Sequence, residues 1–282
     1  MKLKTLTAAA ALFAAFGSAT AQTASPSMVF LSTLEDRTNF LPGQIKPHDW
    51  PRYIDRPRRM FEEEVKGRFG TFENFDEYLD ASMPALDEAK LKAADIIVIV
   101  TGRGAVDAAR FDIIKPLMEK TDPTKPQTFI IFSEGYPAAQ GNTSKFADTL
   151  ATMMGGGTLT RGGARQVFPL NENSPYADAA KGVMQGMEGS SYSQMANIPS
   201  EFAMYTLNSV APGDTSADAY LTFVPHDKAN GGACTFFVGD LSLFLNNDGG
   251  DPDMRDPWTR ACQSHAGHAR AVLQTQRIRH QG

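Results

Sequence analysis

The chain has 282 residues, with 27 lysine and arginine residues against 32 aspartate and glutamate residues, and a formal net charge of −5 at pH 7. This length allows one large domain or two small ones with a well-buried core. No basic tract is present, so a nucleic-acid partner is not expected. No apolar run of membrane-spanning length follows the N-terminal segment, so we also expect no membrane association of the mature chain.

Residues 1–21 have the pattern of an export signal. Lys2 and Lys4 give a positive start, an apolar segment covers residues 6–16, and an A-x-A cleavage site (ATA) closes the pattern. The apolar segment is too short to cross a membrane, although a structured N-terminal helix is an alternative. We predict a signal peptide and a soluble, periplasmic or secreted mature chain of residues 22–282.

Cys234 and Cys262 are the two cysteines of the chain. In an exported protein, two cysteines indicate a disulfide. The bond would close a loop of about 28 residues, which the chain-entropy model values at on the order of 3 kcal/mol. The alternative is that one of them is a cysteine nucleophile.

Five consecutive β-branched residues stand at Ile96–Val100. A run that is apolar on both faces is typical of a strand in a parallel sheet covered by helices. Further strands are predicted at Ser27–Thr33, Thr128–Phe132, Ala219–Val224 and Cys234–Gly239. Phe69–Tyr78 fits a strand or a helical turn equally. Apolar spacing and capping residues predict helices at 55–68, 83–93, 106–120, 143–154 and 257–279.

Strand, helix and strand follow one another over residues 96–132, which predicts a right-handed βαβ unit. Pro116 is expected to kink or shorten its helix. The last two strands are joined through Asn230-Gly231-Gly232, which has the chemistry of a hairpin turn. Residues 158–200 are rich in Gly, Ser, Asn and Met with little periodicity, so we predict an irregular insertion within a single α/β domain.

Polar residues follow each of the predicted central strands. If these strands are parallel, their carboxyl ends meet at one edge, where open α/β sheets bind their ligands. The residues that this argument places at the edge are Thr33, Thr101, Gly102, Arg103, Ser133, Glu134 and Asp240. We predict that a small molecule or a protein partner binds there.

Ser133 invites comparison with the nucleophile elbow G-x-S-x-G, because Gly135 stands two residues after it. Ile131 takes the place of the first glycine, so the match is partial, and an ordinary strand-end serine is the simpler interpretation. In the hydrolase hypothesis, His226 is the general base and Asp240 or Glu134 is the acid that orients it.

Other motifs are weaker indications of a binding site. Gly102-Arg103-Gly104 and Gly155-Gly156-Gly157 could face a phosphate, but they form neither G-x-G-x-x-G nor a P-loop, and tight turns explain them. Asn246–Asp256 holds four aspartates that could bind calcium, without the spacing of an EF-hand. A zinc site would use Cys262, His265, His268 and the distant His280, but the predicted disulfide already uses Cys262. We therefore predict no metal and no cofactor.

Three stretches resemble the class I glutamine amidotransferase-like fold. Ala94–Gly102 after LDEAKLKA is similar to the step where a helix leads into a central strand. TFIIFSEG followed by FADTLATMMGGG resembles the next strand and helix, and GGACTFFVGDLSLFLNN resembles the late strand and turn of exported, non-glutaminase relatives. The resemblance covers Ser27–Asn247, with 158–200 poorly matched. It implies an α/β three-layer sandwich of flavodoxin-like type with a mostly parallel central sheet.

The chain departs from glutaminases of that fold. They carry a cysteine after the central strand, where this chain has Ser133 or Thr101, and a later His-x-Glu pair that is missing here. Glutaminase activity is therefore not expected. Two hypotheses stay open: an exported small-ligand or protein-binding accessory module, and an exported serine-type hydrolase that uses Ser133.

Overall fold

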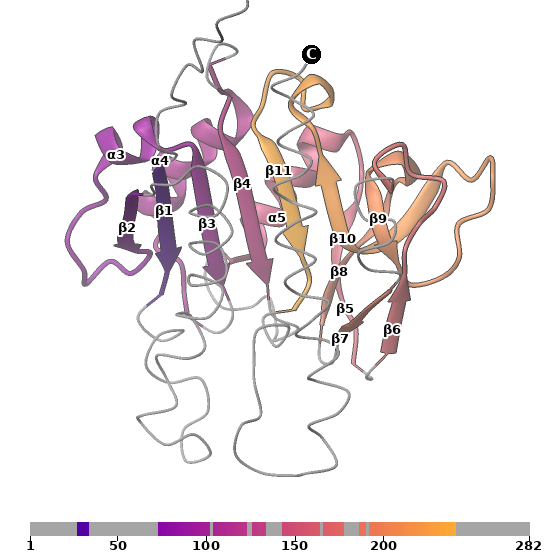
Figure 1. Ribbon diagram of the computed structural model, residues 1–282. Coiled ribbons are helices and arrows are strands. Elements are labelled where there is room, and N and C mark those ends of the chain that lie inside the picture. The colour runs from indigo at the N-terminus through magenta and orange to yellow at the C-terminus, as the bar shows by residue number, and fades with distance from the viewer. Residues whose placement is uncertain are drawn as a thin grey trace, which may run out of the picture.

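The computed structural model describes residues 27–33, 73–101, 104–122, 126–133, 143–163, 166–177, 186–189 and 192–240. These residues form a nine-stranded sheet and a separate two-stranded sheet, with helices beside the larger one (Figure 1). The predicted signal peptide and the helices predicted at 55–68 and 257–279 lie outside the described residues.

One half of the large sheet is parallel. Its strands, in spatial order, are β2 (Glu73–Tyr78), β1 (Ser27–Ser32), β3 (Ile96–Thr101), β4 (Thr128–Ser133) and β11 (Cys234–Val238). Every neighbouring pair in this series is parallel. Numbered along the chain within this half, the order is 2-1-3-4-5, the order of flavodoxin-like sheets. The strands predicted from apolar runs are confirmed, and the ambiguous Phe69–Tyr78 stretch supplies β2.

The other half of the sheet is antiparallel, so the sheet as a whole is mixed. It contains β10 (Ser216–Val224), β8 (Ser193–Pro199), β5 (Thr158–Arg161) and β9 (Ala203–Thr206). β10 and β11 form the predicted hairpin. Their connection contains a 3-10 turn, η3 (His226–Lys228), followed by Asn230 and Gly231 at φ values of 51° and 87°.

The described residues between 158 and 200 contain four strands, which is more regular structure than the sequence predicts. Within this range β5 and β8 join the large sheet, while β6 (Gln166–Pro169) and β7 (Gly186–Gly189) form the two-stranded sheet. A second 3-10 turn, η2 (Ser200–Phe202), follows β8. The reason for the difference is that three of these strands have only four residues and that β8 buries polar side chains, Ser193 and Gln194, where alternation would require apolar ones.

Three α-helices lie between strands of the large sheet: α3 (Glu88–Ala93) leads from β2 to β3, α4 (Ala108–Glu119) from β3 to β4, and α5 (Thr143–Met154) from β4 to β5. α3 begins later than predicted because the Asp87 side chain caps it, accepting a hydrogen bond from the N–H of Lys90 at 3.1 Å. Asp107 caps α4 in the same way. Pro116 lies in the last turn of α4, and the helix continues past it to Glu119.

The parallel strands bury side chains on both faces, as predicted. On one face, Val29, Leu31, Ile97 and Ile99 pack in the cluster that also takes the buried apolar side chains of α3, α4 and α5. We call this the helix face. On the opposite face, Met28, Phe30, Ile96, Val98 and Val100 belong to a second cluster, which includes Phe168 and Tyr192. Among the described residues, no helix has both the length and the apolar character needed to span a membrane.

Candidate functional site

The parallel strands end in polar residues at one edge of the sheet. The register pairs Ser32 with Val100, Thr101 with Ser133, and Phe132 with Val238, so the strands finish at the same level. This confirms that the described residues of the predicted edge meet there. Thr33, Thr101, Ser133 and Asp240 are only 0%, 1%, 4% and 0% exposed. Four buried polar side chains therefore lie at or just after the ends of β1, β3, β4 and β11.

The loops after β1 and β3 touch each other at this edge. A Cβ atom on Gly104 would collide with the side chain of Thr33, so the backbone at Gly104 packs directly on that hydroxyl-bearing side chain. The Thr101 hydroxyl donates a hydrogen bond to the carbonyl oxygen of Phe132 at 3.2 Å, which links β3 to β4 at the same level. The contact between Gly104 and Thr33 could not be predicted, because nothing local in the sequence shows it.

Main-chain hydrogen bonds hold the loop after β2 at this edge. The N–H of Leu79 donates to the carbonyl oxygen of Ser32 at 3.0 Å, and the N–H of Asp107 donates to the carbonyl oxygen of Leu79 at 2.9 Å. Because Asp107 also caps α4, the start of that helix is fixed relative to the end of β1.

A buried arginine also binds the loop after β2. Arg110, in the first turn of α4, is 6% exposed. Its guanidinium donates hydrogen bonds to the carbonyl oxygens of Tyr78 and Pro84 at 2.8 Å and of Met83 at 2.6 Å. No local sequence pattern indicates this role, since an arginine inside a helix is most often on its solvated side.

His226 lies at the opposite edge of the sheet from Ser133. Its Nδ1 is 2.7 Å from the carbonyl oxygen of Gly232, shortly before β11 begins. The first residue of β11, Cys234, is in register with Thr128, the first residue of β4. Ser133 ends β4, so the length of that strand, roughly 16 Å, separates the two groups. A general base must lie within about 3 Å of the hydroxyl it serves, so the predicted Ser133–His226 pair is wrong. Asp240, one of the two acids predicted to orient His226, does lie at the same edge as Ser133.

Several predicted residues lie outside the described part of the chain. These are Gly102, Arg103, Glu134, Cys262, His265, His268 and His280, together with the Asp-rich stretch Asn246–Asp256. Cys234 is described and is 2% exposed, facing the cluster opposite the helix face. The Cys234–Cys262 disulfide therefore stays a prediction. Within the described ranges, no group of three or more His, Cys, Asp or Glu residues could hold a metal ion.

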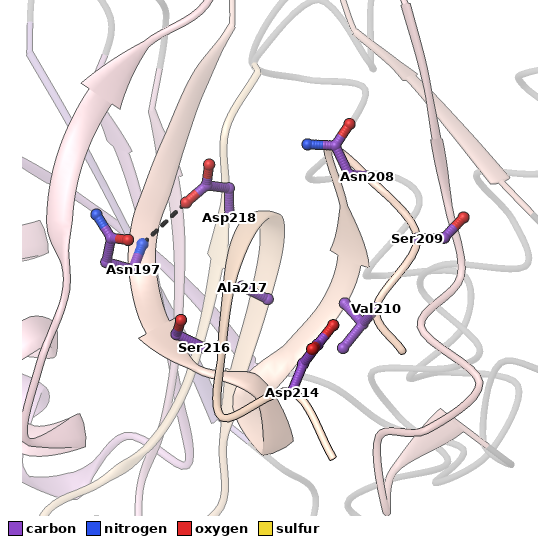
Figure 2. Close-up of a pocket in the computed structure, with 8 residues that line it drawn as sticks. All are labelled: Asn197, Asn208, Ser209, Val210, Asp214, Ser216, Ala217 and Asp218. Atoms are coloured by element: carbon purple, nitrogen blue, oxygen red, sulfur yellow. Dashed lines mark hydrogen bonds between the residues drawn. The ribbon is translucent and has the colours of Figure 1, made fainter. Parts of the chain in front are cut away.

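A polar hollow of about 270 Å³ lies away from the strand-end edge, where β8 ends and β10 begins (Figure 2). Its lining includes two acids, and each accepts a main-chain hydrogen bond. Asp218 accepts from the N–H of Asn197 at 2.9 Å, and Asp214 accepts from the N–H of Ala211 at 2.7 Å. These hydrogen bonds order the turn that leads into β10. Gly213, with a φ of 96°, allows the backbone to take the conformation of this turn.

Tyrosines inside the fold hold their protons strongly. Burial raises the pKa of Tyr176 to about 12, with the negative charges of Asp227 and Glu201 adding to the effect. Burial also raises the pKa of Tyr205, which is 1% exposed. These tyrosines are therefore neutral at ordinary pH.

No family model matches the chain, and no curated protein matches it. Among solved structures, the chain is similar to a ThuA-like protein from Bacteroides uniformis ATCC 8492, at 11% identity over 88% of this chain and 91% of that chain, with a TM-score of 0.46. It is also similar to a ThuA-like protein from Parabacteroides merdae ATCC 43184, at 11% identity over 76% and 78% of the two chains, with a TM-score of 0.37. ThuA-like proteins have the class I glutamine amidotransferase-like fold.

Proposed function

We propose that the chain is an exported, flavodoxin-like three-layer sandwich without glutaminase activity, which binds a small polar ligand between the ends of β1 and β3. The periplasm or the extracellular space is its proposed location, on the strength of the N-terminal export pattern. A protein that docks over the same edge is the second form of this proposal, in which the chain acts as an accessory module.

One observation carries the proposal: the direction of the chain reverses between β1 and β3. From β1 the chain continues to β2 on one side, and from β3 it continues to β4 on the other. In open α/β sheets, connections that leave in opposite directions open a crevice at the carboxyl ends of the two strands, and ligands bind in it. Thr33 and Gly104 stand at that point.

The residues at this edge suit a ligand held by hydrogen bonds. The hydroxyls of Thr33, Thr101 and Ser133 can each donate and accept, and Asp240 contributes a carboxylate on β11's side. No lysine or glycine-rich phosphate motif accompanies them. We therefore expect a neutral or cationic polar molecule in preference to a nucleotide.

A thermal-shift panel tests the proposal. The purified mature protein is heated with mononucleotides, small carboxylic acids, amines and polyols in turn. We expect one polar class to raise the Tm of the wild type, because a ligand that binds only the folded state stabilises it. In Thr101→Val, which removes one edge hydroxyl at nearly constant shape, that Tm increase should shrink.

Thr152→Val is the matched control. Thr152 is an exposed threonine on α5 whose hydroxyl bonds within its own helix, so its loss should leave the ligand-induced Tm increase unchanged. An increase that is equal in both variants would contradict the proposed site. Native mass spectrometry of the protein from its own producing cells then separates the two forms of the proposal, because it detects a bound small molecule or a bound protein by mass.

A further inference from the structure

We propose that Thr160 on β5 and Gln194 on β8 form a binding site for an ammonium group, the –NH₃⁺ end of a primary amine. The site lies where the start of β8 meets the end of β11. It goes beyond the function proposed above, because it is separate from the crevice between β1 and β3 and has a stated chemical group as its ligand.

Two side-chain oxygens at this place are buried without a hydrogen-bond partner. They are Oγ1 of Thr160 and Oε1 of Gln194, and neither has a partner within the described part of the chain. Gln194 is only 9% exposed. Native proteins pair nearly all such buried oxygens, because an unpaired one costs free energy. A bound molecule that donates hydrogen bonds would supply what both oxygens need.

The two side chains stand directly opposite each other. Thr160 and Gln194 are in register in the antiparallel pair of β5 and β8, where opposite Cβ atoms are about 5 Å apart. The preceding Leu159 and the following Met195, also in register, pack in the helix-face cluster, so Thr160 and Gln194 point to the opposite face. A nitrogen that donates to two oxygens at about 2.8 Å each can bridge a gap of up to about 5.6 Å. One donor group can therefore reach both side chains.

Aromatic rings lie on the same face beside Gln194. Tyr192 stands two residues before it, and Tyr220 follows Ala219, which is in register with Met195. Both tyrosines belong to the cluster opposite the helix face, with their ring centroids 6.0 Å apart. The π-systems of aromatic rings attract cations. These rings therefore favour a cation over an anion at this place.

A buried carboxylate follows directly at the end of β11. The N–H of Ser193, the residue before Gln194, donates to the carbonyl oxygen of Gly239 at 2.6 Å. The next residue is Asp240, which is 0% exposed. Arg161, the cation next along β5, points to the opposite face of that strand. Because a buried cation needs a negative charge close by, Asp240 favours an ammonium group over a neutral donor.

Saturation-transfer difference NMR tests the site in the purified mature protein, because it detects weak binding through the signal of the small molecule itself. The probe is methylammonium chloride. The matched probe is tetramethylammonium chloride at the same concentration, which has the same charge but no N–H donor. We expect a saturation-transfer signal from the methyl group of methylammonium and a clearly weaker one from tetramethylammonium, since only the first can donate to the two oxygens.

Two substitutions each remove one acceptor at similar size. Thr160→Val and Gln194→Met should each weaken methylammonium binding by about tenfold, because each loses a hydrogen bond to a charged donor. Thr158→Val is the matched control. Thr158 lies on the same strand and face, opposite Ala196, but is exposed, so the methylammonium signal should equal that of the wild type. Should Gln194→Met not fold, Gln194→Glu replaces it, and its negative charge should strengthen the binding of methylammonium.

Three results would overturn the proposal: no methylammonium signal in the wild type, equal signals from the two probes, or a signal that survives in Thr160→Val and Gln194→Met. If the signal is absent and Thr160→Val lowers the Tm of the free protein, the two oxygens hold an ordered water molecule only. The ligand panel described above is read with Thr101→Val and this test with Thr160→Val, so either proposal can fail while the other holds.

Discussion

Gly104 and Thr33 are in direct contact at the point where the chain turns away from β3 and β1, with no room between them for a Cβ atom. The contact joins two loops that are about 70 residues apart in the sequence. It places the backbone of one strand-end loop against the side chain of the other. Any group bound in the crevice between the two strands would therefore meet both loops together.

Gly104→Ala is the first test of that contact. The new methyl group would overlap the Thr33 side chain, and overpacking of this kind destabilises by about 1–3 kcal/mol. Gly163→Ala is the control, because a Cβ there has nothing within 4 Å and should change stability by less than about 0.5 kcal/mol. Urea unfolding of both variants checks this. Equal stability of the two variants would mean that the Thr33 side chain moves away without cost.

The sequence was a good guide to the parallel half of the sheet. The run at Ile96–Val100 is apolar at every position, which distinguishes a strand buried on both faces, and β1, β4 and β11 show the same signal. Because polar residues follow each of these strands, the strand-end edge could be predicted as well. The residues at that edge could be predicted because they follow apolar runs closely, and such a local pattern is visible in a single sequence.

The antiparallel half of the sheet and the separation of Ser133 from His226 could not be predicted from the sequence. β5 has four residues and partly exposed side chains, so its place beside β8 depends on pairing partners far away in the sequence. The sequence predicts a Ser133–His226 pair because serine and histidine form a known catalytic pair. Their separation follows from strand register, Cys234 opposite Thr128, which residue types do not reveal.

The separation of Ser133 and His226 predicts that Ser133 is not an activated nucleophile. A serine hydroxyl reacts with covalent serine probes when a base lies within hydrogen-bond distance, and here the histidine is at the other edge of the sheet. We expect no labelling of the wild type by a fluorophosphonate probe under conditions that fully label a serine hydrolase added to the same tube. Labelling that disappears in Ser133→Ala would restore the hydrolase hypothesis with a different base.

Arg110 is expected to be among the most sensitive polar positions. Arg110→Met leaves the carbonyl oxygens of Tyr78, Met83 and Pro84 without their donor, at a cost of roughly 3 kcal/mol or more. Lys115→Met on the same helix removes an exposed pair with Glu119, 3.4 Å long, and should cost less than about 0.5 kcal/mol. Denaturant midpoints compare the two. A loss no larger for Arg110→Met would show that water reaches the three carbonyl groups.

The raised pKa of Tyr176 predicts how the free energy of unfolding changes at high pH. The folded pKa of about 12 lies above the ordinary value of 10, so between these values the unfolded chain gives up the Tyr176 proton while the folded chain keeps it. Stability is therefore unaffected by this group below pH 10 and falls as the pH rises from 10 toward 12. In Tyr176→Phe this part of the decline should be absent.

The measurement is urea unfolding of both proteins at pH 9, 10, 11 and 12, because the difference between them removes the effect of every other group that titrates in this range. The Tyr205 pKa is also raised, so a Tyr205→Phe variant should flatten the same part of the curve. Parallel curves for the wild type and Tyr176→Phe would show that Tyr176 is open to water in the folded protein.

Two buried threonines on neighbouring strands should respond in opposite ways to the same substitution. The Thr222 hydroxyl on β10 has no hydrogen-bond partner within the described part of the chain, although the residue is 0% exposed. The Thr235 hydroxyl on β11, equally buried, donates to the carbonyl oxygen of Ala233 at 3.2 Å. Because an unpaired buried hydroxyl costs free energy, Thr222→Val should stabilise the protein by about 1 kcal/mol, whereas Thr235→Val should destabilise it by about as much. Urea midpoints measured at unchanged m-value decide the question, and a loss of stability in Thr222→Val would mean that its hydroxyl is paired after all.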